Sequence, residues 1–216
     1  MTAVPRIAPL GDSALTITFG AAIDAATAAA VGRLAATIPA RPPRGFVELV
    51  PGYVTLTLYF DPLATSVRQL ADDITVLIAR PTVAEATPSS RLVEIAVRYD
   101  GPDLANVAAA TGLSEAEVIS RHSAPEYRVG LLGFVPGFAY LGPIDPALVL
   151  PRRSSPRARV PAGSVAIAGA QTGIYPAETP GGWHLIGHTA VTLFDPARAP
   201  PALLAVGDRV RFLVER

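Results

Sequence analysis

Residues 160–187, VPAGSVAIAGAQTGIYPAETPGGWHLIG, combine hydrogen-bonding side chains with an unusual amount of bare backbone. The segment contains six glycines, one acidic residue and no lysine or arginine. Glycine lets a ligand approach the main chain closely, and amide and hydroxyl groups hold small polar molecules. The alternative is that glycine and proline only turn the corners of a small β-barrel. On the first interpretation the segment forms a neutral, amide-binding pocket with Ser164, Gln171, Thr172, Tyr175, Trp183 and His184.

Two neighbouring segments add aromatic and cationic groups to this predicted pocket. The upstream stretch GFVPGFAYLG, residues 133–142, supplies Phe134, Phe138 and Tyr140. Guanidinium groups bind carboxylate or phosphate through paired donors, although a charged loop is often only a solvated surface. The stretch PRRSSPRARV, residues 151–160, supplies four such groups: Arg152, Arg153, Arg157 and Arg159.

Several familiar kinds of catalytic site are excluded. Ser164 lies in AGSVA, which is not the Gly-x-Ser-x-Gly turn of a serine hydrolase. His184 and His188 lie in an extended segment, where four residues span roughly 13 Å, so we expect no shared metal ion. Lysine is absent, which excludes a Gly-Lys-Ser/Thr phosphate loop and a Schiff base. Carboxylates are also scarce in this half, so we expect an incomplete acid–base site that another chain completes.

Composition excludes other classes of protein. The 216 residues are 50% hydrophobic and 17% charged, with a formal net charge of zero. We therefore expect a globular protein that binds neither nucleic acid nor an anionic membrane. No signal peptide or membrane-spanning run is expected, and the absence of cysteine favours a cytoplasmic location.

The first 82 residues predict a small α+β domain of ferredoxin-like type. ALTITF (14–19), FVELV (46–50) and YVTLTLYF (53–60) have the alternation of strands. Asp24 is expected to cap a helix whose apolar face includes Val31, Leu34 and Ile38. A second helix is expected from Thr65 to the proline at 81, with this apolar face: Val67, Leu70, Ile74 and Leu77.

The remaining residues, 83–216, predict a mainly β domain that follows a proline- and serine-rich linker at 80–91. RLVEIAVRY alternates as a strand, and Ser114 with Glu117 forms a capping box at the start of a short helix. Short apolar runs separated by glycine and proline follow, namely YRVGLLGF, SVAIAG, AVTLF and VRFLV. This pattern favours a closed or partly closed barrel of short strands.

Long stretches of the chain resemble one family. GFVPGFAYLG, SPRARVPAGSVAIAGAQTGIYP, TPGGWHLIGHT and GDRVRF are similar to the B subunit of prokaryotic 5-oxoprolinase, also called allophanate hydrolase subunit 1. The family includes the kinase-inhibitor protein of sporulating bacteria and is related to the carboxyltransferase part of urea carboxylase. The resemblance implies a cyclophilin-like β-barrel after the α+β domain. It also implies partner subunits C and A, and ATP-dependent hydrolysis of 5-oxoproline to glutamate by the complex.

Matching these motifs residue by residue implies three groups of site residues. His122, as an acid or base or else as a structural histidine, and Tyr127 lie where the chain enters the barrel. The aromatic wall is formed by Phe134, Pro136, Gly137, Phe138 and Tyr140. The substrate space is faced by Arg157, Ser164, Gln171, Thr172, Tyr175 and Trp183. One departure is His188, which stands where the family has arginine.

Three functions follow from the resemblance. The first is a subunit of ATP-dependent 5-oxoprolinase, in which ATP binds to this chain or to another subunit. The second is a subunit acting on allophanate or a urea-like amide. The third is a regulatory protein that inhibits a histidine kinase. The missing acid–base set is compatible with an enzyme subunit and with an inhibitor.

Overall fold

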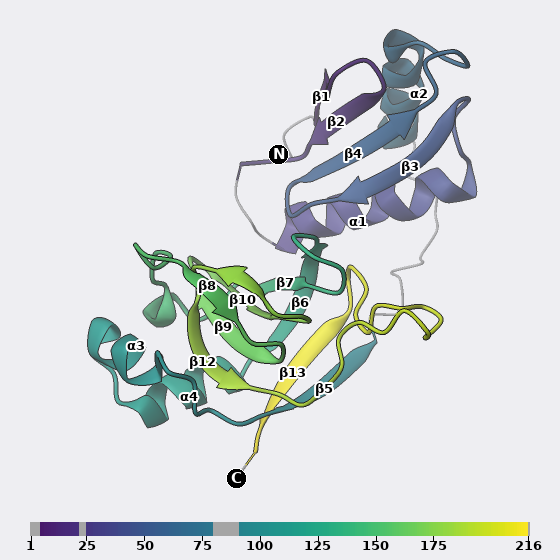
Figure 1. Ribbon diagram of the computed structural model, residues 1–216. Coiled ribbons are helices and arrows are strands. Elements are labelled where there is room, and N and C mark those ends of the chain that lie inside the picture. Colours follow the sequence, from purple (N-terminus) through teal and green to yellow (C-terminus); the bar gives the residue numbers. More distant parts are fainter. Residues whose placement is uncertain (1–4, 22–24, 80–90, 216) are drawn as a thin grey trace. The chain divides into compact units, whose positions relative to one another are not determined.

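The computed structural model describes residues 5–21, 25–79 and 91–215, and the chain divides into two compact units, 1–89 and 90–216 (Figure 1). The predicted helix cap Asp24 and residues 80–90 of the predicted linker lie outside the described residues. The same is true of the predicted domain boundary at 82/83. Each unit has its own hydrophobic core.

The first unit is a four-stranded antiparallel sheet with two helices on one face. The strand order is β1-β2-β4-β3. The elements are β1 (Arg6–Pro9), β2 (Ala14–Thr18), α1 (Ala25–Ala40), β3 (Phe46–Pro51), β4 (Thr55–Phe60) and α2 (Val67–Ala79). Alternate strand residues such as Ile17 and Leu58 pack against Ile38 of α1 and Ile74 of α2. The predicted α+β architecture and the predicted apolar helix faces are confirmed.

The second unit, residues 90–216, is built around a seven-stranded sheet of order β12-β9-β10-β7-β6-β13-β5. Among the described strands of this sheet, only β13 and β5 pair in parallel. Two strands, β8 and β11, form a separate ribbon. The elements are β5 (Leu92–Val97), α3 (Leu104–Thr111), α4 (Glu115–Ser123), β6 (Glu126–Leu132), β7 (Ala139–Gly142), a 3-10 turn (Pro146–Leu148), β8 (Arg157–Val160), β9 (Ser164–Ala168), β10 (Gln171–Ile174), β11 (Thr179–Gly181), β12 (His184–His188) and β13 (Arg209–Val214).

The two edges of this sheet meet, which curls it into a barrel-like shape, and we call the second unit the barrel unit (Figure 1). Arg98, which follows edge strand β5, pairs with His188 at the end of the opposite edge strand β12. Their backbone hydrogen bonds measure 2.9 and 2.8 Å. Pairing of the edges leaves fewer backbone groups without a partner. The curled, mainly β sheet confirms the predicted fold class.

The structure contains strands that the sequence patterns do not predict individually, such as β1 and β10, and it differs from the predicted elements in two further places. Residues 190–194, AVTLF, form no regular strand, and only Phe194 makes an isolated bridge to Ala202. An additional helix, α3, precedes the predicted one. The predicted helix is α4, and its capping box is present: the Ser114 hydroxyl accepts from the Glu117 N–H, while the Glu117 carboxylate accepts from the Ser114 N–H.

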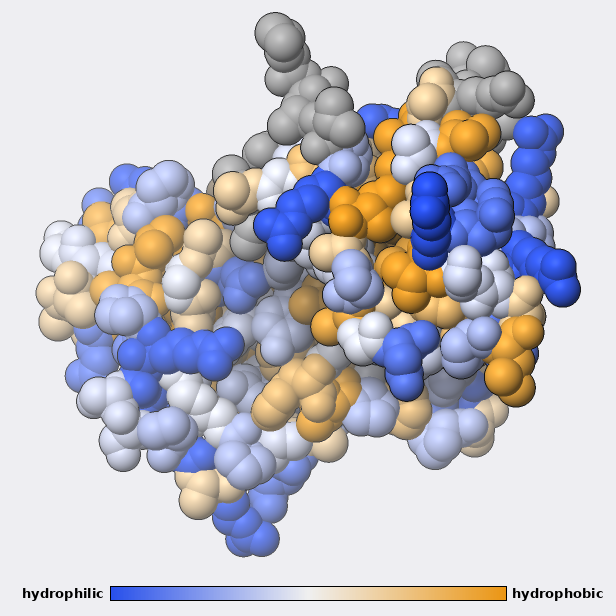
Figure 2. Space-filling view, turned by 90° about the horizontal axis from the view of Figure 1, so that it is seen from above, coloured by the Kyte–Doolittle hydropathy of each residue, from blue (hydrophilic) through white to orange (hydrophobic). Residues whose placement is uncertain are grey.

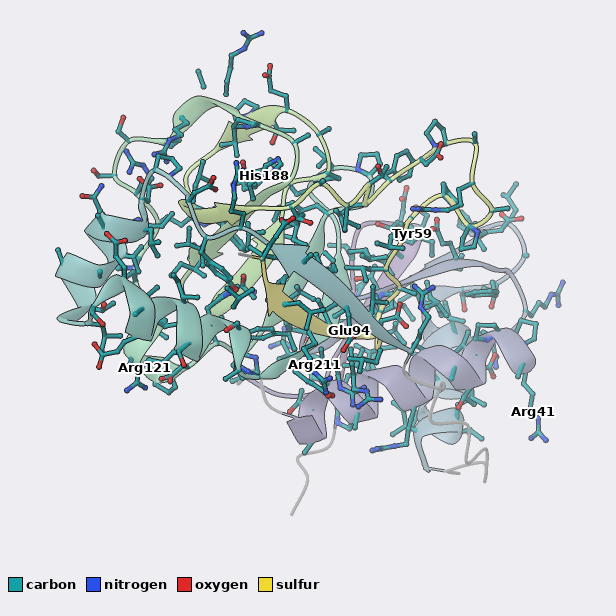
Figure 3. All side chains as sticks on the ribbon, turned by 90° about the horizontal axis from the view of Figure 1, so that it is seen from below. Arg41, Tyr59, Glu94, Arg121, His188 and Arg211 are labelled. Atoms are coloured by element: carbon teal, nitrogen blue, oxygen red, sulfur yellow. The ribbon has the colours of Figure 1, made fainter. Side chains whose placement is uncertain are left out.

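The described surface is mixed in polarity. In Figure 2, hydrophobic residues (orange) gather in groups with hydrophilic residues (blue) between them. On the outer face of β5, β13 and β6, Arg211 bonds Glu94 at 3.1 Å and also bonds Glu126, and Figure 3 shows Glu94 beside Arg211. These exposed ion pairs contribute little to stability because solvent screens them. Within the described chain, no helix is long and apolar enough to cross a membrane.

Candidate functional site

The structure joins the three aromatic residues of the predicted aromatic wall to Tyr175 and Trp183 in one cluster. From here on, the name aromatic wall means these five rings. Phe138, which immediately precedes β7, lies at its centre. Its ring centroid is 4.8 Å from that of Tyr140, 5.3 Å from Tyr175 and 5.6 Å from Trp183. Phe134 adds a fifth ring at 5.6 Å. The contacts are edge-to-face, the arrangement that aromatic quadrupoles favour.

The glycines of the predicted pocket segment make room for these rings. A Cβ atom on Gly173 would lie 3.0 Å from Phe138, and one on Gly181 would lie 2.3 Å from the Tyr175 hydroxyl. The space beside both glycines is therefore filled by aromatic side chains of the chain itself. At these two positions the bare backbone serves packing of the aromatic wall.

Phe134 and its loop form the exposed rim of the aromatic wall. The Phe134 side chain is 59% exposed, and its φ of 72° is uncommon for a bulky residue. The loop lines a shallow hollow of about 400 Å³ that includes Pro136 and Gly137. Gly137 also has a positive φ, 81°, and its absent Cβ would lie 2.6 Å from that of Phe194. Strained backbone of this kind is concentrated at binding sites in other proteins.

Asp103 joins two of the predicted arginines in a group that we call the Asp103 cluster. The Asp103 carboxylate is 1% exposed and accepts hydrogen bonds from Arg153 and Arg157, each at 2.8 Å. Its second oxygen accepts from the Leu185 N–H of β12 at 2.8 Å. Burial raises the pKa of Asp103, but the hydrogen bonds from Arg157 and the Leu185 N–H and the charges of both arginines outweigh burial and hold that pKa below its usual range. The carboxylate is therefore ionised at neutral pH.

Asp103 was not among the residues predicted from the sequence. It immediately precedes α3, where an aspartate normally indicates a helix cap, yet its side chain makes no capping hydrogen bond. Its partners are 50 and 54 residues away in the chain. Local spacing contains no signal for a contact of that separation.

His122 lies inside the core of the barrel unit. The Thr172 hydroxyl donates to the Ala166 carbonyl at 3.0 Å, so it accepts from His122 Nε2 at 2.7 Å. Nδ1 then carries the lone pair that accepts from the Tyr99 hydroxyl at 2.7 Å. The His122 ring stacks on Phe212 with centroids 4.8 Å apart. Every polar atom of this imidazole is therefore engaged.

The structure separates this group from the aromatic wall. Thr172 and its strand neighbour Ile174 face the core that contains Tyr127, whereas Gly173 between them faces Phe138. Tyr127 donates to the His122 carbonyl at 2.7 Å. Of the predicted residues, His122, Tyr127 and Thr172 thus lie on one side of the sheet.

The other predicted residues have different surroundings. Gln171 is half-buried and, by the period of the strand, lies on the same face as Gly173. Ser164 is buried at the start of β9. His188 covers Gly163: a Cβ on that glycine would lie 2.7 Å from His188 Nε2. His184 and His188 lie on one extended strand, as predicted, and the described residues contain no group of three or more potential metal ligands.

We predict that His122 stays neutral through the physiological range. Burial lowers its pKa to about 3, so the unfolded chain binds the proton first as pH falls. The contribution of His122 to the free energy of unfolding should therefore be constant above the unfolded pKa of about 6.5. Below that pH it should fall by about 1.4 kcal/mol per pH unit. NMR titration of the imidazole between pH 5 and 9 tests this. A midpoint within that range would contradict the prediction.

Comparison with known proteins identifies the family and the fold. Residues 5–204 match the family described as carboxyltransferase domain, subdomain C and D. Proteins named as the B subunit of 5-oxoprolinase from Bacillus subtilis (strain 168) and Escherichia coli O157:H7 are 42% and 44% identical to this chain. The alignments cover 99% and 96% of this chain, and 94% of each relative.

Solved structures share the fold. TTHA0988 superposes with a TM-score of 0.83 at 44% identity over 94% of this chain, which spans only 40% of TTHA0988. PH0987 from Pyrococcus horikoshii has a TM-score of 0.57 at 43% identity, with 97% of each chain covered. The urea carboxylase of Kluyveromyces lactis has a TM-score of 0.80 at 18% identity, covering 98% of this chain and 22% of that one, which shows the fold alone.

The match over residues 5–204 thus places the chain among carboxyltransferase subdomains of the C and D type. Within that class, identity above 40% over nearly the whole length distinguishes one family. The chain belongs to the family of 5-oxoprolinase B subunits.

Proposed function

We propose that this chain is a subunit of an ATP-dependent 5-oxoprolinase, which hydrolyses the cyclic amide 5-oxoproline to glutamate. The observation that carries the proposal is the identity of 42–44% to proteins named as the B subunit of 5-oxoprolinase, over 96% or more of the chain. ATP is used by the complex, on this chain or on another subunit. Because the reaction uses ATP and the chain contains no cysteine, the proposed location is the cytoplasm.

The chemistry of the described residues supports a site that is completed by another chain. The Asp103 carboxylate is held by two arginines, and the His122 imidazole is buried with both nitrogens bonded. Neither group is poised to exchange a proton with a substrate. The proposed partners, subunits C and A, supply the remaining acid–base groups.

The lengths of the related structures also support a partner. The same fold covers 97% of PH0987 but only 40% of TTHA0988 and 22% of the yeast urea carboxylase. It therefore occurs both as a chain of its own and as part of longer chains. The relatives from Bacillus subtilis and Escherichia coli, 94% of which align with this chain, are named as subunits, which supports a heteromeric complex.

For the substrate, we propose the face of the sheet that carries the aromatic wall. Gln171 lies on this face and offers an amide to the lactam. Arg157 offers a buried guanidinium nitrogen, Nη1, that has no partner within the described residues. We assign Thr172 a structural role and no contact with the substrate, because its hydroxyl is already bonded to His122 and Ala166.

The test is ATP-dependent glutamate formation by this chain alone, with subunits A and C, and with each subunit omitted. Activity is expected only in the complete set. The variant Gln171→Ala should lower kcat/KM about tenfold to a hundredfold, because one hydrogen bond to the substrate is lost. The matched control is Gln69→Ala, which changes an exposed glutamine of α2 in the other unit.

Two results would count against the proposal in different ways. Inactivity of every combination, with all chains folded, would contradict the 5-oxoprolinase assignment. Equal activity of the Gln171 and Gln69 variants would contradict the pocket while leaving the subunit assignment intact.

A further inference from the structure

A second hollow in the barrel unit shares no lining residue with the aromatic wall. It measures about 430 Å³ and is open to solvent. The loop before β8 supplies Arg152, Arg153, Ser154 and Ser155, and β12 supplies His184. Helix α3, which packs against β12 (Figure 1), closes one side through Ala110. The hollow is therefore lined by cationic and hydroxyl side chains beside three apolar residues, Ala110, Leu150 and Pro151, and, among the described residues, by no carboxylate.

The charges around this hollow do not balance. Asp103 is the only carboxylate that bonds Arg153 among the described residues, and it also bonds Arg157. One carboxylate thus neutralises only one of two cations, Arg153 and Arg157, whose side chains are 29% and 25% exposed. An excess positive charge remains. Arg152, on the lining itself, adds a further cation. Partly buried positive charge without a counterion favours binding of an anion.

Two residues that line the hollow, Arg153 and His184, each contain a buried polar atom without a partner in the described structure. Arg153 donates to Asp103 through Nη1, but its Nε–H is buried and has no partner in the described structure. His184 donates from Nε2 to the Pro151 carbonyl at 2.9 Å, which leaves the buried Nδ1 without a partner among the same residues. An unmet buried polar group costs about 1–3 kcal/mol. A ligand atom that bonded to them would relieve this cost.

These two atoms define what the ligand must carry. The Arg153 Nε–H requires an acceptor, as an oxyanion provides. A carbonyl only accepts, so His184 Nε2 holds the ring proton and Nδ1 of the neutral ring is an acceptor. A ligand that fits both has an anionic oxygen next to an O–H or N–H group. Hydrogenphosphate meets this description, and so does a small carboxylic acid with an adjacent N–H.

We propose that the hollow lined by Arg152, Arg153 and His184 is a binding site for a small oxyanion, a phosphate or a carboxylate that also carries a hydrogen-bond donor. Arg153 supplies the anchoring N–H, Arg152 supplies charge, and the hydroxyls of Ser154 and Ser155 are available to the remaining oxygens. The Asp103 cluster connects this site to Arg157. An oxyanion bound to Arg153 would therefore compete for that arginine with the Asp103 carboxylate, which also holds Arg157.

The proposal is tested with the full chain by isothermal titration at constant ionic strength. Inorganic phosphate and 5-oxoproline are titrated separately, so that the arm that binds identifies the source of the oxyanion. Saturable binding with one ion per chain is expected in at least one arm. Arg152→Gln and Arg153→Gln should each weaken binding about tenfold or more.

The control variant is Arg159→Gln, which removes a cation from the same segment. Arg159 is 81% exposed, pairs with Glu178 and does not line the hollow. Its binding constant should stay within about twofold of that of the unchanged chain. Arg152 forms no ion pair in the described structure, so its variant tests the site without disturbing Asp103.

Absence of saturable binding in both arms would overturn the proposal, as would equal weakening by the Arg152 and Arg159 variants. Because the titration uses this chain alone, its outcome is independent of glutamate formation by the complete set of subunits. Full activity without oxyanion binding would reject the site but not the 5-oxoprolinase assignment. Oxyanion binding without glutamate formation would reject the 5-oxoprolinase assignment but not the site.

Discussion

Replacing Asp103 with asparagine is expected to destabilise the barrel unit by about 3 kcal/mol at pH 7. The substitution removes the charge but little volume. It leaves Arg153 and Arg157 beside each other without their common counterion, and both are largely buried. The effect arises mainly from this uncompensated charge, because an asparagine oxygen still accepts from the Leu185 N–H.

The measurement is urea unfolding followed by fluorescence of Trp183, the single tryptophan, which lies in the barrel unit. The pKa of Asp103 is lowered in the folded chain, so its contribution is present above the unfolded pKa of about 3.9. The difference between variant and unchanged chain should therefore shrink as pH falls below about 4. Asp100→Asn, an exposed carboxylate that pairs with Arg98, is the control. Equal unfolding midpoints for the two variants would contradict the assigned role of Asp103.

The parts of the fold that the sequence predicts are those determined by neighbours along the chain. The capping box of Ser114 and Glu117 lies within one turn, and the structure contains both of its hydrogen bonds. The apolar stripe of Val31, Leu34 and Ile38 follows the helical period, and all three residues are buried. Period and capping are local properties, so no knowledge of the tertiary fold is needed to detect them.

The site depends on contacts that local patterns do not contain. Asp103 precedes a helix, which indicates a cap, but its arginine partners come from the loop before β8 and from β8 itself, 50 and 54 residues later. Gly173 suggests backbone open to a ligand, whereas the ring of Phe138, far earlier in the chain, fills that space. The alternation in residues 190–194 resembles a strand, but only Phe194 finds a pairing partner. In each case the residue type is compatible with more than one structural role, and the tertiary environment determines which role it has.

Closure of the barrel depends on a close approach of two backbones at Gly101. The segment after β5 runs against β12, with Gly101 donating to the Ile186 carbonyl at 3.3 Å and Asp103 to the Leu185 carbonyl at 2.9 Å. A Cβ on Gly101 would lie 2.4 Å from the Leu185 oxygen and 2.5 Å from the Gly187 nitrogen. Both neighbours are backbone atoms, which cannot move aside as a flexible side chain can.

Gly101→Ala is therefore expected to destabilise the barrel unit by about 3 kcal/mol, the upper part of the range for overpacking. The clash pushes the two segments apart, and Asp103, two residues further on, moves away from the Leu185 N–H. Trp183 fluorescence during urea unfolding measures the loss. Gly133→Ala is the matched control, because no atom lies within 4 Å of its added Cβ and its φ is not positive. If the Gly101 variant is as stable as the Gly133 variant, the edges of the sheet do not meet as closely as described, and the path that carries Asp103 to its arginines is a different one.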